Sequence, residues 1–309
     1  MNIVEKSASH MIGETMNSNE RKNSTAISDI TSLVKAVVLI ANVLPVFTGF
    51  WLALYFTNTS LAAHWDTLLL TLIGSTLVMA GALMFNNWYE VDLDKKMMRT
   101  ESRPTVTGTI PLNVVLMLGI AATILGFILL LFTSVEATAY AFIGWFTYVV
   151  LYTFWTKRRY TLNTVIGSVS GAVTPLIGWA AIESAWHIIP IVLALVLFIW
   201  QIPHTFAVAI KRFDEYKAAG VPMLPVVHGF QFTKRQTVVY IACLLPLPLF
   251  LTSLGTTFAV VATLLNVGWL ILGISGFFTK DDRAWARMIF ISSLAYLTML
   301  FLMMIVVTV

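Results

Sequence analysis

The chain has 309 residues, of which 58% are hydrophobic and only 11% are charged. A soluble globule of this size needs more polar surface than that, so the composition excludes a water-soluble enzyme and predicts a membrane protein. The net charge of +4 suits anionic lipid headgroups or an anionic substrate, although a membrane protein with basic inner loops has such a charge without either. We expect a lipid bilayer around the chain and no nucleic acid partner.

The first 28 residues are polar and lack the apolar core and cleavage site of a secretory signal. We expect residues 1–28 to form a disordered cytoplasmic tail and residues 29–309 to form a single membrane domain. The one cysteine, Cys243, lies within an apolar stretch, which excludes a disulfide framework or a cysteine metal site.

Apolar stretches without Asp, Glu, Lys or Arg follow the tail, each close to the roughly 20 residues that a helix needs to cross a bilayer. We therefore predict an all-α, polytopic protein with nine transmembrane helices around a central cavity. The predicted spans are 36–56, 67–89, 111–132, 137–155, 162–182, 188–210, 237–254, 258–278 and 288–308.

The charges between these spans predict the orientation. With an inside amino terminus, all 19 Lys and Arg residues fall on one side, whereas the outer connections hold only Asp66, Glu136 and Glu183. Basic residues of short loops stay on the cytoplasmic side, so we predict N-in, C-out, in a bacterial inner membrane.

Two inner loops, 90–110 and 211–236, are long, and long loops in compact proteins are usually functional. Because they recur four spans apart, we expect an internal duplication in which both loops meet over the cavity.

The first loop begins with an acidic run. Asn86, Glu90 and Asp94 are spaced i, i+4 and i+8, which places them on one face of a helix. Carboxylates so placed repel each other, and Mg²⁺ favours such oxygens while keeping positions for substrate phosphates. The alternative is a solvated helix end whose acids pair with Lys95, Lys96 and Arg99.

A second candidate lies around the sixth span. Gln201 and His204 fall about two turns inside the membrane, where polar groups are costly unless they face a cavity or a partner. A hydrogen-bonded structural histidine is an equal alternative. Lys211 and Glu215 stand i, i+4 apart at the helix end, and such a pair alone is more often a salt bridge than a site.

The two runs together resemble the UbiA-type intramembrane prenyltransferases. Residues 86–104, Asn-Asn-Trp-Tyr-Glu-Val-Asp-Leu-Asp through Arg-Pro, resemble the first acidic motif of that family. Residues 200–204, Trp-Gln-Ile-Pro-His, and residues 219–227, Ala-Gly-Val-Pro-Met-Leu-Pro-Val-Val, resemble the branch that farnesylates haem. The chain departs from the family at Glu90, where Asp is usual, and at Lys211 and Glu215, where two aspartates are usual.

The resemblance implies transfer of a farnesyl group from farnesyl diphosphate to a vinyl group of haem b, giving haem O, with Mg²⁺ as cofactor and haem b as substrate. It also implies a downstream oxidase that converts haem O to haem A. The competing enzyme hypothesis is prenylation of an aromatic quinone precursor. A transporter is disfavoured, because the predicted spans carry no Asp, Glu, Lys or Arg.

The resemblance assigns roles to residues of both runs. Mg²⁺ ligands are Asn86, Glu90 and Asp94, and the wider catalytic set adds Asp92 and Glu215. Diphosphate contacts are Lys35, Arg99, Arg103, Lys211 and Arg212. The substrate and haem pocket comprises Trp200, Gln201, His204, Asp214, Tyr216, His228, Tyr148 and Tyr152, and the aromatic wall facing an allylic cation draws on Trp88, Tyr148, Tyr152, Trp155 or Trp200.

Overall fold

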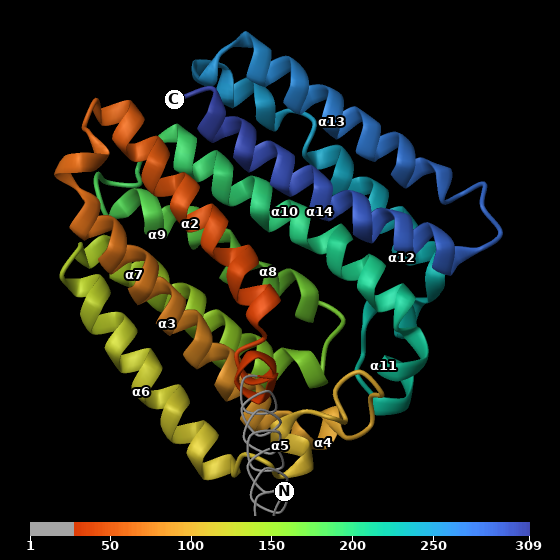
Figure 1. The fold of residues 1–309 in the computed structure, drawn as a ribbon. Helices are drawn as coiled ribbons and strands as arrows, with labels where there is room; N and C mark the ends of the chain where they lie inside the picture. The colour runs from red at the N-terminus through yellow and green to blue at the C-terminus, as the bar shows by residue number, and fades with distance from the viewer. Residues whose placement is uncertain (1–27) are drawn as a thin grey trace, which may run out of the picture.

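The computed structural model describes residues 28–309, which form helices and no strand (Figure 1). The predicted tail, apart from residue 28, lies outside the described residues. The long helices are α2 (Ala36–Thr57), α3 (Trp65–Tyr89), α6 (Leu112–Leu131), α7 (Val135–Phe146), α10 (Ile188–Lys211), α12 (Leu224–Cys243), α13 (Thr256–Ser275) and α14 (Asp282–Val306). The short ones are η1 (Leu61–Ala63), α4 (Val91–Asp94), α5 (Pro104–Thr107), η2 (Thr147–Trp155), η3 (Thr156–Arg158), α8 (Asn163–Ala172), α9 (Thr174–Ala180), α11 (Phe213–Ala219) and η4 (Leu247–Leu254).

Eight helical segments within residues 28–309 are long and apolar enough to cross a membrane, which confirms the all-α membrane class but not the number nine. Seven correspond closely to predicted spans. The eighth, Leu224–Leu254, begins well before the predicted span 237–254, because α12 starts inside the second loop and bends at Gly229, whose φ of 77° ends one helical stretch and begins another.

The predicted continuous span 162–182 is wrong in detail, because the chain there forms two short helices, α8 and α9, that meet at Val173. Pro175 stands in the first turn of α9, where proline's missing N–H and fixed φ are tolerated but an uninterrupted helix is not favoured. Hydropathy does not record this break, since both halves are apolar.

Small residues bring α9 against α2. A Cβ atom added at Gly178 would lie 1.9 Å from the Val46 carbonyl oxygen, and one at Gly49 would lie 2.1 Å from the Pro175 carbonyl oxygen. No side chain fits at either contact, so the two backbones touch directly. This crossing holds the α8–α9 segment against α2, on the wall of the cavity described below.

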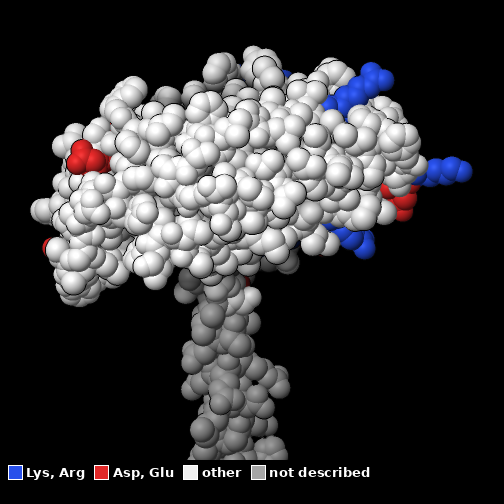
Figure 2. Space-filling view, turned by 90° about the horizontal axis from the view of Figure 1, so that it is seen from above, with Lys and Arg blue, Asp and Glu red and all other residues white. Residues whose placement is uncertain are grey.

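The two long inner loops meet, as predicted. Leu93 and Met97 of the first loop pack with Ala219, Val221 and Met223 of the second in one buried cluster. In Figure 1, α4, α5 and α11 lie together at the lower end of the bundle, whereas the carboxyl terminus lies at the upper end. Figure 2 shows a wide band without charged groups, with Lys and Arg gathered at one end of the molecule. This distribution is that of a membrane protein.

Candidate active site

A polar cavity lies where α3 ends. Asn86 is on the last turn of α3, Glu90 caps that helix, and Asp94 ends α4, so that the three side chains face the same space and are almost fully buried. The cavity holds about 670 Å³ of empty space. Its wall also includes Lys35, Arg99, Arg103, Tyr148, Tyr152, Lys157 and Tyr216. We call it the ionic cavity.

Asn86, Glu90 and Asp94 each pair with a different cation. None of these cations is Lys95, Lys96 or Arg99, the partners that the solvated-helix alternative requires. The pairs are Lys35 Nζ donating to Asn86 Oδ1 at 2.5 Å, Lys157 Nζ to Glu90 Oε2 at 2.5 Å, and Arg103 Nη1 to Asp94 Oδ2 at 2.5 Å.

Lys35 differs from the other two cations in its electrostatic surroundings. It precedes α2 in the left-handed conformation, with φ of 48°, and lies just outside the membrane span. Burial of the ammonium group and, next, the positive charge of Arg103 lower the pKa of Lys35 to about 7. The charge of Lys35 therefore responds to any anion that enters the cavity.

Asp92, predicted to support the metal ligands, lies elsewhere. Its side chain is 59% exposed and accepts two hydrogen bonds from Arg158, at 2.7 and 2.8 Å. The hydrogen bond from the Arg158 guanidinium holds the pKa of the Asp92 carboxyl below its ordinary value. Asp92 thus fastens α4 to the end of the fourth span, and it does not line the ionic cavity.

The fourth span reaches the ionic cavity through a π-helix. Residues 135–146 are α-helical, whereas residues 147–155 form η2, a π-helix whose turns are wider. Residues five apart lie about 140° apart around an α-helix but nearly stack in a π-helix. Tyr152 lies on this π-helix and Lys157 on the 3-10 turn η3 that follows it, and the two line the same wall, with the Lys157 ammonium 5.5 Å from the centre of the Tyr152 ring.

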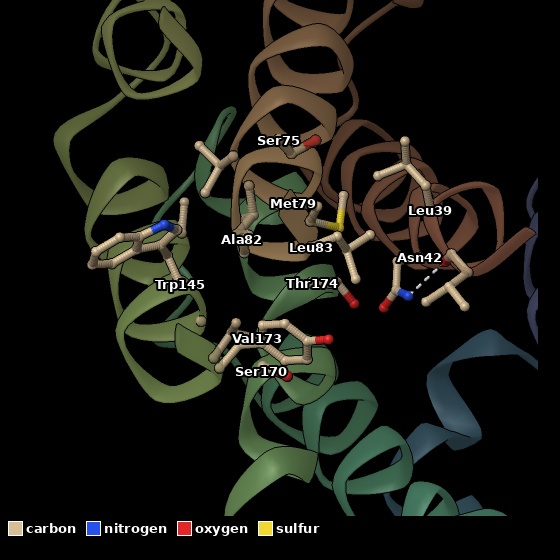
Figure 3. A pocket seen from close by; sticks show the side chains of 16 residues that line it. Leu39, Asn42, Ser75, Met79, Ala82, Leu83, Trp145, Ser170, Val173 and Thr174 are labelled. Carbon is tan, nitrogen blue, oxygen red and sulfur yellow. Dashed lines mark hydrogen bonds between the residues drawn. The ribbon is translucent and has the colours of Figure 1, made fainter. Parts of the chain in front are cut away.

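An apolar cavity of about 590 Å³ lies next to the ionic cavity, in the membrane part of the fold (Figure 3). The two share Val38, Leu83 and Tyr148 as wall residues. Figure 3 shows Leu83, Met79 and Ser75 along α3, opposite Val173 and Thr174 of the α8–α9 segment. The wall comprises Val38, Leu39, Asn42, Ser75, Val78, Met79, Ala82, Leu83, Ala141, Gly144, Trp145, Tyr148, Ser170, Val173, Thr174 and Ile177.

Only Tyr216 of the second run lines either of these cavities, so they lie in the amino-terminal half of the bundle rather than at its centre. The other charged residues there make local or exposed pairs. Arg212 pairs with Glu215 at 2.7 Å, Arg283 pairs with the 72% exposed Asp214, and Lys211 lies over the Phe290 ring. One buried carboxylate oxygen of Glu215, Oε2, has no hydrogen-bond partner.

Residues 200–204 face two different neighbours. The Trp200 indole N–H donates to the Ser293 carbonyl, and His204 Nδ1 lies 2.7 Å from the Ser293 hydroxyl, both on α14. Gln201 instead donates to the carbonyls of Leu197 and Ser168. These bonds match the structural alternative for His204. Three further predicted aromatic residues lie off both cavity walls: Trp88 in a separate apolar cluster, Trp155 at 45% exposure and His228 at the surface.

The donor set of the ionic cavity fits a magnesium ion that is completed by a substrate. No group of three or more His, Cys, Asp or Glu side chains suited to a metal occurs within residues 28–309. Asn86, Glu90 and Asp94 instead offer one amide and two carboxylates, and Glu90 Oε1 is buried without a hydrogen-bond partner. Mg²⁺ commonly takes one or two carboxylates and fills its remaining positions with water and phosphate oxygens.

Sequence reasoning missed Lys157 as a site residue and did not place the apolar cavity. Lys157 follows Tyr152 by five residues, a spacing that points to opposite sides of an α-helix, so helical periodicity argued against a shared wall. A signal was present, because Lys157 opens a basic run directly after a span that carries Tyr148 and Tyr152.

The chain matches the UbiA prenyltransferase family over residues 42–294. It belongs to that family. A curated relative from Oceanobacillus iheyensis, named protoheme IX farnesyltransferase, is 56% identical over 99% of this chain and 98% of its own. A relative of the same name from Bacillus cereus is 55% identical over 92% of this chain and 93% of its own length.

Solved structures of the same fold are more distant in sequence. A digeranylgeranylglyceryl phosphate synthase has a TM-score of 0.73 and 18% identity, covering 91% of this chain and 98% of its own. A UbiA homologue from Archaeoglobus fulgidus, bound to DMAPP and Mg²⁺, has a TM-score of 0.66 and 15% identity, covering 87% of this chain and 99% of its own. These likenesses establish the prenyltransferase fold.

Proposed function

We propose that the chain transfers a farnesyl group from farnesyl diphosphate to a vinyl group of haem b, giving haem O and diphosphate. The donor half is supported by an ionic cavity and an apolar one that lie side by side and share the wall residues Val38, Leu83 and Tyr148. A prenyl diphosphate has the same two halves in the same order. The acceptor half rests on the names of the two bacterial relatives.

The donor lies along α3. Asn86 and Ser75 are eleven residues apart on this helix, which corresponds to about 16 Å of helix axis and suits an extended chain of three isoprene units. The diphosphate then sits among Lys35, Arg99 and Arg103, while the chain runs past Leu83 to Ser75.

Ionisation of the allylic carbon–oxygen bond is the step that this arrangement serves. Charge builds up on the departing diphosphate, and cations fixed in a poorly hydrated cavity stabilise it without having to reorganise. Arg99, Arg103 and Lys157 carry that role, and Lys35 joins them when protonated. When bound, Mg²⁺ held by Asn86, Glu90 and Asp94 adds Lewis-acid stabilisation of the same charge.

The allylic cation forms beside Tyr148 and Tyr152, whose ring centres are 5.6 Å apart. Aromatic faces attract a desolvated cation by up to about 2 kcal/mol. Both rings lie on the ionic cavity, and Tyr148 also lines the apolar one, which is where C1 of the donor would lie.

The haem vinyl group approaches from the side of the second run, where Tyr216 reaches the ionic cavity. Because Ser293 engages His204 Nδ1, only Nε2 of that ring is left to contact iron or to orient the water that completes the hydroxyethylfarnesyl group. Lys211, Arg212, Asp214, Glu215 and His228 do not line the ionic cavity, and we assign them to the surroundings of the acceptor rather than to diphosphate.

The chain works as a bacterial inner-membrane enzyme with the ionic cavity on the cytoplasmic side and the carboxyl terminus outside. Its product would pass to an oxidase that makes haem A. The gathering of Lys and Arg at one end supports this orientation (Figure 2). Protease protection of carboxyl-terminal tags in right-side-out and inverted vesicles tests it.

Mass spectrometry of haem extracted from membranes incubated with haem b, farnesyl diphosphate and Mg²⁺ tests the reaction. We expect a product heavier than haem b by a farnesyl group and a hydroxyl group, the latter supplied by one water molecule. A gain of mass on a supplied aromatic quinone precursor, with haem b unchanged, would overturn the acceptor assignment and favour the competing enzyme hypothesis.

A further inference from the structure

In the ionic cavity, a cation is already paired with one oxygen of each side chain that would hold a metal ion. Glu90 is the clearest case, since Oε2 accepts from Lys157 and only Oε1 is without a partner. Lys157 is itself 14% exposed and comes from a segment 67 positions away, so this pair is not a by-product of neighbouring residues on one helix.

The charge balance of the cavity works against a free metal ion. Four cations and two carboxylates line it, a net formal charge of +2. The two carboxylates are almost fully buried, and buried charges are tolerated only when they are paired. A divalent cation arriving alone would both displace an ammonium group and raise the positive charge. A prenyl diphosphate carries more negative charge than one Mg²⁺ neutralises, so the two together lower the positive charge.

We propose that Lys157 neutralises the Glu90 carboxylate until a diphosphate enters, and is then transferred to the diphosphate while Mg²⁺ becomes the partner of that carboxylate. The inference rests on the proposed prenyl diphosphate site and adds to it a binding rule. The cavity takes metal and diphosphate together and rejects free Mg²⁺. Lys157 thereby selects the metal–diphosphate form of the donor.

The surroundings of Lys157 offer its ammonium group a second partner besides Glu90. The Tyr152 ring lies 5.5 Å from the ammonium and attracts it whether or not Glu90 is its partner. Arg103 and Lys35 hold Asp94 and Asn86 in the same manner, so one entering diphosphate can receive cations from all three positions.

Isothermal titration calorimetry of the full-length protein in detergent tests the exchange. Mg²⁺ is titrated into the protein alone and then in the presence of inorganic pyrophosphate. The heat of metal–pyrophosphate formation is measured in a protein-free titration and subtracted. For the unchanged chain we expect Mg²⁺ to bind at least roughly 10-fold more weakly alone than with pyrophosphate. Equal affinities in the two titrations would overturn the proposal without any variant.

The variant Lys157→Met separates exchange from support of the fold. We expect free Mg²⁺ to bind roughly 10-fold more tightly, because the metal no longer competes with the ammonium group for Glu90. We expect pyrophosphate to bind roughly 10- to 100-fold more weakly, because it loses a charged hydrogen bond. Lys157→Arg should restore the original pattern. Lys96→Met, at an exposed lysine of the same end and off the cavity wall, is the matched charge control and should change neither affinity.

Opposite changes in the two affinities support the exchange, whereas weakening of both assigns Lys157 to structural support and overturns it. If Lys96→Met and Lys157→Met have equal effects, the change in affinity reflects the overall charge of the protein, and the proposed exchange is also overturned. If the chain makes haem O but the two affinities do not change in opposite directions, only the proposed exchange is wrong. If they do change in opposite directions but no haem O forms, only the acceptor assignment is wrong.

Discussion

The two inner loops carry similar residues, acids next to bases at the end of a helix, but the structure uses them differently. In the first loop Glu90 and Asp94 are almost fully buried, and Glu90 takes its cation from a distant segment. In the second, Arg212 pairs with its neighbour Glu215, and Asp214 pairs with Arg283 at the surface. Burial of the charged groups, rather than their presence or the sequence separation of their partners, distinguishes a binding cavity from a charged helix end.

The strongest test of this difference replaces one carboxylate in each loop by an amide. Asp94→Asn should lower turnover by roughly 10²- to 10³-fold, because it removes a charge that positions both Arg103 and the metal. Asp214→Asn should lower turnover far less, since its ion pair is exposed and Asp214 does not line the ionic cavity. Haem O formation per folded protein, quantified by chromatography, is the measurement. Equal losses would place both loops on the diphosphate.

The arginines provide a second, smaller contrast. Arg103→Met should raise the KM for farnesyl diphosphate, with kcat/KM falling roughly 10- to 100-fold through loss of a charged hydrogen bond. Arg212→Met should not change the KM for the donor, because Arg212 does not line the ionic cavity. Steady-state kinetics with varied donor distinguishes the two, and a raised donor KM in the Arg212 variant would return the second loop to diphosphate binding.

The apolar end of the donor cavity can be tested by filling it. Ser75→Phe places a ring where the distal isoprene unit would lie, and such overpacking costs about 1–3 kcal/mol, or roughly 10-fold or more in affinity for the farnesyl donor. Dimethylallyl diphosphate, which ends before Ser75, should bind as before. Leu125→Phe, on the exposed side of α6, is the control. Equal loss for both donors would contradict the proposed path of the chain.

The smallest expected effect is that of the aromatic wall. Tyr152→Leu should lower kcat several-fold, in line with a cation–π attraction of about 1 kcal/mol, whereas Tyr152→Phe should retain most of it. Single-turnover kinetics under saturating donor isolates the chemical step. A phenylalanine variant as slow as the leucine variant would assign the role to the hydroxyl group instead of the ring.

Hydropathy predicted most of the fold because a bilayer restricts a chain to long apolar helices. It could not predict the break at Val173, where both halves are apolar, or the early start of α12. The shared face of Asn86, Glu90 and Asp94 followed from helical spacing, but the outward position of Asp92 depended on its pair with Arg158. The pairing of Lys157 with Glu90 depends on tertiary structure and on the change from α-helix to π-helix and then to a 3-10 turn before Lys157, none of which periodicity reveals.

The π-helix separates two functions of the fourth span along its length. Upstream of residue 147, α-helical spacing places Ala141 and Trp145 on the wall of the apolar cavity, whereas the π-helix places Tyr152, and the turn η3 after it places Lys157, on the wall of the ionic cavity. Substitutions in the upstream part can therefore reshape the lipid-like pocket while the ionic end keeps its register. A one-residue insertion or deletion between 147 and 155 would instead rotate one end relative to the other, so this stretch should tolerate changes of side chain better than changes of length.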